Sequence, residues 1–295
     1  MKIKISCAAC KQKYKFEVEQ AGRFEVTCPL CNAGLNFEVT TLLPDNSAPA
    51  EIISDVANTS FFATPEHHQP LLSYFQKRNI KCSYKGNNVD TTGFFDEAAC
   101  LIGDHYQLFE PLLKQIKFAY RQNFSSITIP LQKYSASEQQ QLRTICAELH
   151  DKTFLRKAFF DREKNGLQLI LADTPTIAQF FNGGWLEWYG LMCCLAPLEN
   201  RTFPAGFSIG RGIEIVSLDG NRYELDIVFL LHDQLTVIEC KSGEFRDAIP
   251  RHQQLQKHLG VAKANYLLCA TEFTPEKANA LTAMYPLTFL PLSSL

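Results

Sequence analysis

A glutamate and a lysine, two residues apart, end an apolar segment in the C-terminal half of the chain. Glu239 and Lys241 close the run Thr-Val-Ile-Glu-Cys-Lys. Because side chains alternate between the two faces of a β-strand, we expect Glu239 and Lys241 to share one face, with Ile238 and Cys240 on the other. Charged groups at the end of an apolar strand lie where the hydrophobic core stops, and there they are available for chemistry.

Two further acids precede this pair. Asp226 lies in the apolar run Glu-Leu-Asp-Ile-Val-Phe, where an unpaired buried carboxylate would be costly. Glu187 is the one acid of the aromatic run Trp-Leu-Glu-Trp-Tyr. Carboxylate oxygens suit Mg²⁺ or Mn²⁺, and such ions polarise a phosphate and activate water for phosphodiester hydrolysis. The pattern thus predicts a catalytic metal site, with Lys241 positioning the water or neutralising transition-state charge. Glu224 is a second-ranked ligand.

Each of these acids alone is more often a surface residue or half of an ion pair, and Asp-x₁₂-Glu-x-Lys arises by chance in many proteins. The hypothesis therefore depends on the four residues occurring together. A structural ion network and another metal-dependent activity stay open as alternatives. Further along, Arg251, Gln254 and Lys257 fall on an expected helix that could reach substrate phosphates, and Gln254 and Lys257 share a face.

The elements that would position these residues follow the order helix, three strands, helix, strand, helix, strand. The dipeptide Asp219-Gly220 is a strong signal for a hairpin. Periodicity and turn residues predict a helix over 185–195, strands over 212–218, 222–231 and 235–241, a helix over 248–259, a strand over 265–270, a helix over 275–284 and a last short strand.

Four of the eleven cysteines have the spacing of a metal site. Cys7 and Cys10, then Cys28 and Cys31, form two Cys-x-x-Cys pairs seventeen residues apart. Four thiolates give the closed tetrahedral shell of structural Zn²⁺. Hairpin strands are expected over 14–18 and 22–26, so residues 1–40 are predicted to be a zinc ribbon. A redox dithiol is the main competing interpretation.

We expect a linker over 41–60, a small α/β domain of unknown role over 61–175 and the nuclease-like domain over 176–295. Within the middle domain, the pattern predicts helices over 104–122 and 137–149, with Ser137 as N-cap, and strands over 126–131, 154–160 and 167–171. The pair His67-His68, in a proline-flanked segment, is expected to be solvated.

Composition is that of an ordinary globular protein, with 46% apolar and 20% charged residues and a formal net charge of −2. Residues 111–164 nevertheless hold ten Lys/Arg against five Asp/Glu, and residues 241–263 hold five against two. No segment approaches the ~20 apolar residues of a membrane helix, and no signal peptide is evident. We therefore expect a cytoplasmic protein with reduced thiols.

The runs Asn-Gly-Gly-Trp-Leu-Glu (182–187), Glu-Leu-Asp (224–226) and Ile-Glu-Cys-Lys-Ser-Gly (238–243) resemble the PD-(D/E)xK nuclease superfamily, over about residues 176–270. They are most similar to the C-terminal nuclease domain of Card1-type CRISPR-associated nucleases. The resemblance implies an α/β (α+β) restriction-endonuclease-like core. It also implies that Glu187, Asp226 and Glu239 hold Mn²⁺ or Mg²⁺, that Lys241 assists the water, and that the substrate is DNA or RNA.

Those relatives carry a Rossmann-like sensor for cyclic oligoadenylate before the nuclease. This sequence has no glycine-rich phosphate loop there, so the resemblance does not lead us to expect activation by a cyclic nucleotide. The predicted function is a metal-dependent endonuclease acting on DNA, with RNA second, in defence against foreign nucleic acid. A nucleic-acid-binding or scaffold protein with an inactive nuclease fold, and a repair or recombination nuclease, are the alternatives. A homodimer, a protein partner and a small-molecule activator are left open.

Overall fold

The computed structural model describes residues 2–6, 9, 13–17, 22–28, 31, 33–39, 65–84, 93–161, 166–198, 206–217 and 220–295. The chain divides into two compact units, Met1–Ala50 and Glu51–Leu295. Each unit is considered by itself. Within the described residues, no helix is both long enough and apolar enough to cross a membrane.

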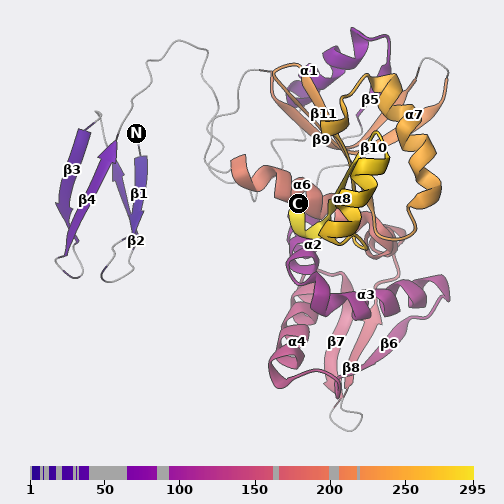
Figure 1. Ribbon diagram of the computed structural model, residues 1–295. Helices are drawn as coiled ribbons and strands as arrows, with labels where there is room; N and C mark the ends of the chain where they lie inside the picture. The colour runs from indigo at the N-terminus through magenta and orange to yellow at the C-terminus, as the bar shows by residue number, and fades with distance from the viewer. Residues whose placement is uncertain are drawn as a thin grey trace. The chain divides into compact units, whose positions relative to one another are not determined.

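The smaller unit consists of two antiparallel hairpins, β1 (Lys2–Ser6) with β2 (Lys13–Glu17) and β3 (Gly22–Thr27) with β4 (Gly34–Val39) (Figure 1). Cys28 is buried directly after β3, and its N–H donates a 2.8 Å hydrogen bond to the carbonyl oxygen of Ala33, whereas Cys31 is exposed. Cys7 and Cys10 lie outside the described residues. The expected zinc site thus stays a prediction.

The larger unit is built on a six-stranded mixed sheet (Figure 1). The central strands form an antiparallel meander, and the last three run parallel. Along the sheet the strands follow the order β13 (Thr288–Pro291), β12 (Tyr266–Ala270), β11 (Gln234–Lys241), β10 (Arg222–Leu231), β9 (Ser208–Val216) and β5 (Lys81–Ser83).

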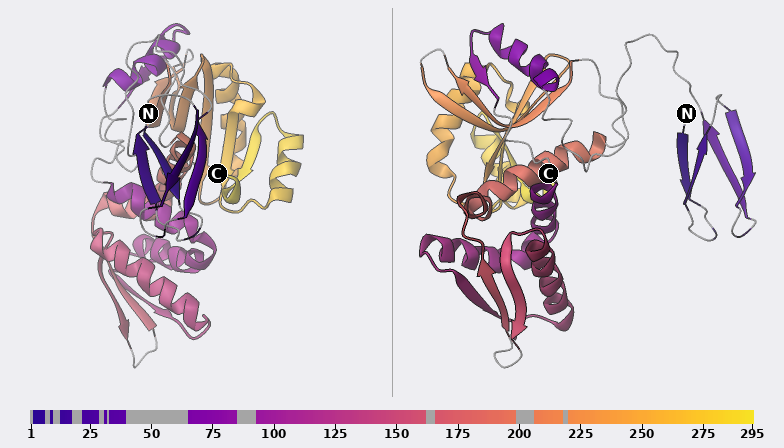
Figure 2. Two further views of the ribbon diagram at one scale, coloured as in Figure 1. Left: turned by 90° about the vertical axis from the view of Figure 1, so that its left-hand side faces the viewer. Right: turned by 180° about the vertical axis from the view of Figure 1, so that it is seen from behind.

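Apolar residues on both faces of this sheet explain why helices cover both sides of it (Figure 2). Helix α6 (Trp185–Leu195) packs on one face, where Ile227, Ile238 and Cys240 join its core. The core of the other face is completed by α1 (Pro65–Gln76), α7 (Ile249–Leu259) and α8 (Pro275–Met284). The expected mixed α/β architecture and the order of its elements from α6 onward are confirmed.

Between α1 and α6 the chain forms a second, antiparallel sheet in the order β6 (Ser126–Pro130), β8 (Gly166–Leu171), β7 (Leu155–Asp161). It packs with α2 (Phe94–Asp104), α3 (Tyr106–Arg121) and α4 (Ala136–Asp151). The single helix expected over 104–122 is wrong at its start, because α2 ends at Asp104 and α3 begins at Tyr106. The N-cap of α4 is Ser135 rather than Ser137, since Ser135 forms a capping box with Glu138.

Two features join the expected middle domain to the C-terminal sheet. Strand β5, from residues 81–83, is the edge strand beside β9. One core also runs without a break from Leu112 on α3 and Leu142 on α4 through Trp185 on α6 to Ile238 on β11. The predicted domain boundary between residues 175 and 176 stays a prediction. The six-stranded sheet, however, contains strands from both sides of that boundary.

His67 and His68 are not solvated, contrary to expectation. Both are buried on α1, and the backbone N–H of Ile209 donates a 3.0 Å hydrogen bond to His67 Nε2. Burial first, and then the neighbouring His68, lower the pKa of His67 to about 4. A neutral imidazole can accept this bond, so His67 links α1 to β9.

At Gly103, α2 closely approaches α6. A Cβ there would lie 2.3 Å from the Tyr189 ring, which is held by a 3.1 Å hydrogen bond from its hydroxyl to Asp104. We expect Gly103→Ala to lower the free energy of unfolding by about 1–3 kcal/mol, since overpacking outweighs a gain of at most ~1 kcal/mol in helix propensity.

Chemical denaturation of the full chain would measure this. Gly243→Ala is the matched control, because no atom lies within 4 Å of its Cβ position, and its effect should stay within about 0.5 kcal/mol. Equal stabilities for the two variants would contradict the predicted close packing.

Candidate active site

The structure brings three of the four predicted catalytic residues into contact, where the first half of β10 meets the end of β11. Lys241 Nζ lies 3.6 Å from Asp226 Oδ2 and 3.8 Å from Glu239 Oε2. Asp226 Oδ2 also accepts a 2.7 Å hydrogen bond from the backbone N–H of Cys240. Glu187, in the first turn of α6, is the fourth residue, and its charge interacts with that of Asp226.

The regular pairing of β10 with β11 stops next to the acids. Ile227 and Ile238 form the last pair of the ladder, Asp226 and Glu239 are the next residues of the two strands, and both approach Lys241. Leu225 and Val228 both contribute to one core whereas Ile227 contributes to the other, so the regular alternation of β10 shifts by one residue at Asp226. Gly212, opposite on β9, has a left-handed φ of 62°. This irregularity keeps the Asp226 carboxylate out of both cores.

Arg211 on β9 holds Glu187, and the sequence analysis did not identify it. Its Nη1 lies 2.9 Å from Glu187 Oε2, and its guanidinium stacks 3.7 Å from the centre of the Trp188 ring. A signal was present, because Arg211 lies between two glycines and is the one basic residue of β9. The lone acid of α6 therefore has a cationic partner.

His252 on α7 is a second residue that was missed. Its Nδ1 lies 3.1 Å from the Tyr266 hydroxyl and 3.7 Å from Glu239 Oε2. Burial, followed by the charges of Lys241 and Arg251, lowers the pKa of His252 to about 3. The imidazole is therefore neutral at physiological pH, and its approach to Glu239 is not an ion pair. Its position three residues after Ile249 and three before Leu255, both buried, could have predicted its inward orientation.

Burial and mutual repulsion disfavour the negative charges of Glu187 and Glu239 in the metal-free protein. Burial, followed by the nearby Asp226, raises the pKa of Glu187 to about 7, although Arg211 opposes the shift. The same two causes raise the pKa of Glu239 well above its usual range. Burial lowers the pKa of Lys241, but Asp226 and Glu239 outweigh this, so its pKa is above the ordinary value and the ammonium keeps its charge.

These residues fit a divalent cation by their chemistry. Glu239 is 2% exposed, and its Oε1 has no hydrogen-bond partner in the described structure. A buried carboxylate oxygen without a partner is costly, and a hard cation would satisfy it. Across the described residues, however, no group of three or more His, Cys, Asp and Glu side chains is close enough to form a metal site as it stands. Glu187 is directed to Arg211 instead.

The predicted substrate-binding residues lie on the exposed side of α7. Arg251 is near the acids: its charge acts on the Glu239 carboxyl, and its guanidinium carbon lies 5.2 Å from the centre of the Tyr223 ring. Gln254 and Lys257 are exposed further along the helix. The contacts of Arg251 are with Arg222 and Tyr223 on β10, and a role in substrate binding stays a prediction for all three residues.

The turn after β11 is held from two sides. Lys117 Nζ on α3 donates hydrogen bonds of 3.0 Å to Ser242 Oγ and 3.2 Å to its carbonyl oxygen. Ser242 Oγ in turn donates a 3.3 Å bond to the carbonyl oxygen of Asn182. A Cβ on Gly183 would lie 2.8 Å from Ser242 Oγ, so a glycine permits this close approach. The residue next to Lys241 is therefore fixed by α3 and by the turn that precedes α6.

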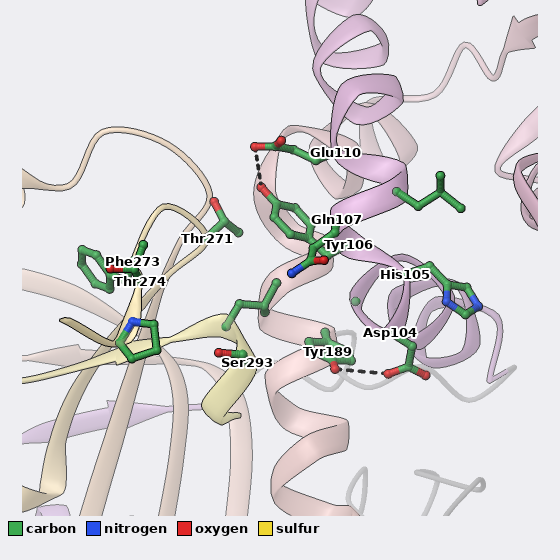
Figure 3. Close-up of a pocket in the computed structure, with 14 residues that line it drawn as sticks. Asp104, His105, Tyr106, Gln107, Glu110, Tyr189, Thr271, Phe273, Thr274 and Ser293 are labelled. Atoms are coloured by element: carbon green, nitrogen blue, oxygen red, sulfur yellow. Dashed lines mark hydrogen bonds between the residues drawn. The ribbon is translucent and has the colours of Figure 1, made fainter. Parts of the chain in front are cut away.

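A cavity of about 890 Å³ lies elsewhere, and none of the four predicted catalytic residues lines it. Figure 3 shows it between the start of α3 and the region around Thr271 and Ser293, with hydrogen bonds from Tyr106 to Glu110 and from Tyr189 to Asp104. Lys and Arg are absent from its described lining, which carries the carboxylates Asp104 and Glu110. Because it lacks both the predicted acids and Lys241, it is not the predicted site of phosphodiester chemistry.

A comparison with protein families agrees with this location. The sequence model of the Card1-like endonuclease domain family matches residues 175–272. A search of the curated proteins found no match. Protein VC1899 from Vibrio cholerae is similar in structure, with a TM-score of 0.52 and 15% identity over 76% of this chain and 57% of that chain. Can2 from Sulfobacillus thermosulfidooxidans, solved in complex with cyclic tetra-adenylate, has a TM-score of 0.47 and 19% identity over 74% of this chain and 55% of that chain.

The family match covers Glu187, Asp226, Glu239 and Lys241 together with the α6 to β12 elements. It confirms the resemblance of this part of the chain to a Card1-type endonuclease domain and supports a nuclease. The likeness to VC1899 is one of fold. The chain spans somewhat more than half the length of these two solved structures.

Proposed function

We propose that the protein is a metal-dependent endonuclease whose active site consists of Glu187, Asp226, Glu239 and Lys241. The observation that carries the proposal is the buried Glu239 carboxylate, which has one oxygen unsatisfied and shares the Lys241 ammonium with Asp226. A structural ion pair would not need the second, repelling carboxylate. The match of the surrounding residues to an endonuclease domain supports the same function.

In this proposal Glu187, Asp226 and Glu239 hold Mg²⁺ or Mn²⁺, which when bound would polarise the scissile phosphate and promote ionisation of the attacking water. Lys241 keeps its proton because two carboxylates face it. Its ammonium can then orient the water and offset negative charge on the phosphate oxygens. Arg211 orients Glu187, and the N–H of Cys240 orients Asp226.

We further propose DNA as the substrate, with RNA second, and Arg251, Gln254 and Lys257 as phosphate contacts. Defence against foreign nucleic acid is proposed from the resemblance to Card1-type nucleases. Cys7, Cys10, Cys28 and Cys31 are proposed to hold a structural Zn²⁺ in the smaller unit. The proposed zinc would stabilise a unit too small to bury a large core.

Metal dependence is the first prediction to test. The full chain is incubated with supercoiled plasmid, single-stranded DNA and RNA, with Mg²⁺, with Mn²⁺ or with EDTA. We expect cleavage with one or both metals and none with EDTA. Without the metal, the three carboxylates supply no Lewis acid that could polarise the phosphate or activate the water. Electrophoresis of the products then identifies the substrate.

Cleavage that persists in EDTA would contradict the metal-dependent mechanism. Binding of nucleic acid without cleavage under every metal condition would instead favour an inactive nuclease fold that only binds. If none of these substrates is cut, nicked and branched DNA are assayed next, and cleavage restricted to them would favour the repair or recombination alternative.

A further inference from the structure

Helix α3 carries a row of cationic side chains that the proposed nuclease mechanism does not use. Lys114, Lys117 and Arg121 are three, four and seven residues apart, so they lie on one face of the helix. Phe118 belongs to the same face. Lys114, Phe118 and Arg121 are exposed, and Lys117 is partly buried. We call these four residues the α3 stripe.

The α3 stripe is physically joined to the candidate active site. The bonds from Lys117 Nζ to Ser242 hold the residue that directly follows Lys241. The inner side of α3, through Leu112, Leu113 and Ile116, belongs to the same core as α6 and β11. The stripe therefore has a fixed position beside the site, and a strand bound there would continue from the scissile phosphate.

The charges of the stripe are poorly compensated. Lys114 pairs with Glu110 at 2.9 Å, but neither Lys117 nor Arg121 has a carboxylate partner within the described part of the chain. Burial first, and then Arg121 and Lys114, lower the pKa of Lys117. Like charges held this close to one another cost free energy, and phosphates of a nucleic acid would offset that cost.

Exposed aromatic rings accompany these charges. Phe118 is 52% exposed and Phe124, three residues after α3, is 53% exposed. The two rings contact each other edge to face, with centroids 6.1 Å apart and planes at 69°. Bases stack on exposed aromatic rings next to Lys and Arg in strand-binding proteins.

We propose that the α3 stripe and Phe124 form a nucleic-acid-binding surface that guides the substrate strand to or from the cleavage site. Lys114, Lys117 and Arg121 contact consecutive phosphates, while an unstacked base covers Phe118 and Phe124. The proposal depends on the nuclease function for its biological meaning, but the binding surface itself can be tested without cleavage.

The test measures binding of a fluorescent oligonucleotide to the full chain in EDTA at several salt concentrations. Lys114→Gln/Arg121→Gln should weaken binding about tenfold and reduce the slope of log K against log salt by about 1.4–1.8, the loss of two phosphate contacts. The matched control, Lys77→Gln/Arg156→Gln, removes the same charge from exposed positions directly after α1 and on β7, and its slope should be unchanged.

The aromatic part is tested separately with Phe118→Ala/Phe124→Ala. Binding should weaken about fivefold or more, because each stacked base contributes that much, while the salt slope stays that of the wild type. Thermal melting of all variants confirms that they are folded. If Phe118→Ala/Phe124→Ala alters the oligomeric state and leaves oligonucleotide binding intact, the rings belong to a protein interface and the proposal is overturned.

The proposal and the nuclease function fail in different ways. Equal affinities and slopes for the stripe variant and its control, with metal-dependent cleavage intact, overturn the stripe alone. If the stripe variant binds more weakly than the wild type, and the wild type cuts nothing with any metal, the binding surface is supported and the nuclease function is contradicted.

Discussion

The Glu239→Gln variant is expected to lose cleavage about a hundredfold to a thousandfold or more, as when a preorganised charge is removed from an active site, while remaining at least as stable as the wild type. Glu239 is 2% exposed beside Asp226, so its negative charge is costly in the metal-free protein. Glutamine keeps the shape and removes the repulsion. Loss of function with unchanged or increased stability is typical of an active site that has been kept at a cost in stability.

The two measurements distinguish catalysis from a structural role. If the acids only formed an ion network around Lys241, Glu239→Gln would lower stability and leave cleavage unchanged. Thermal melting with added Mg²⁺ or Mn²⁺ supplies a third readout, because a ligand that binds the folded state raises the melting temperature. The wild type should respond to the metal, and Glu239→Gln should respond much less.

Glu272→Gln is the matched control for this variant. Glu272 follows β12, its side chain is 41% exposed, and it pairs with Lys277 at 3.7 Å outside the acid cluster. Exposed pairs of this kind contribute about 0–1 kcal/mol. The control should therefore keep its cleavage rate, its stability and its response to metal. A loss of activity in both variants would point to a general effect of charge rather than to Glu239.

The elements of the C-terminal part could be predicted from sequence because their signals are local. The Asp219-Gly220 turn indicated the hairpin of β9 and β10, and Gly260, with a φ of 63°, ends α7 where expected. Alternation along residues 236–241 placed Glu239 and Lys241 on the same face, and their side chains are in contact. Where local propensity and burial pattern agree, the element is specified by its own residues.

The features that were missed depend on contacts between distant residues. Strand β5 has three residues, too few for a periodicity, and it exists because it pairs with β9 more than a hundred residues later. His67 is buried for the same reason, since its partner is Ile209. The importance of Arg211 and Lys117 follows from their contacts with Glu187 and Ser242, which are distant in sequence. No local pattern contains those pairings.

The arrangement around Glu187 shows how such a distant contact can matter for function. Its carboxylate is bound by Arg211, and Arg211 is stacked on Trp188, the next residue of α6. A cation therefore already faces the acid that the proposed metal also requires. The guanidinium partly offsets the repulsion between Glu187 and Asp226 in the metal-free protein, which lets α6 pack its apolar residues against the sheet.

Removal of zinc is expected to unfold the smaller unit and leave the larger one intact. Structural zinc contributes on the order of 10 kcal/mol or more to units of this kind. The two tryptophans, Trp185 and Trp188, are both on α6, so tryptophan fluorescence, excited selectively, reports on the larger unit alone. Purified protein should contain about one zinc ion per chain. A strong chelator should expose residues 1–50 to protease without changing the tryptophan emission.

Cys28→Ser should lose zinc in the same way, because three remaining thiolates cannot close the tetrahedral shell. Cys82→Ser is the matched control: Cys82 is a partly buried thiol on β5, and burial raises its pKa to about 12, which makes it a poor metal ligand. That variant should keep its zinc. A wild type without zinc would contradict the four-cysteine site, and so would a Cys28→Ser variant with full zinc content and unaltered protease resistance. Either result would favour a redox role for the two Cys-x-x-Cys pairs.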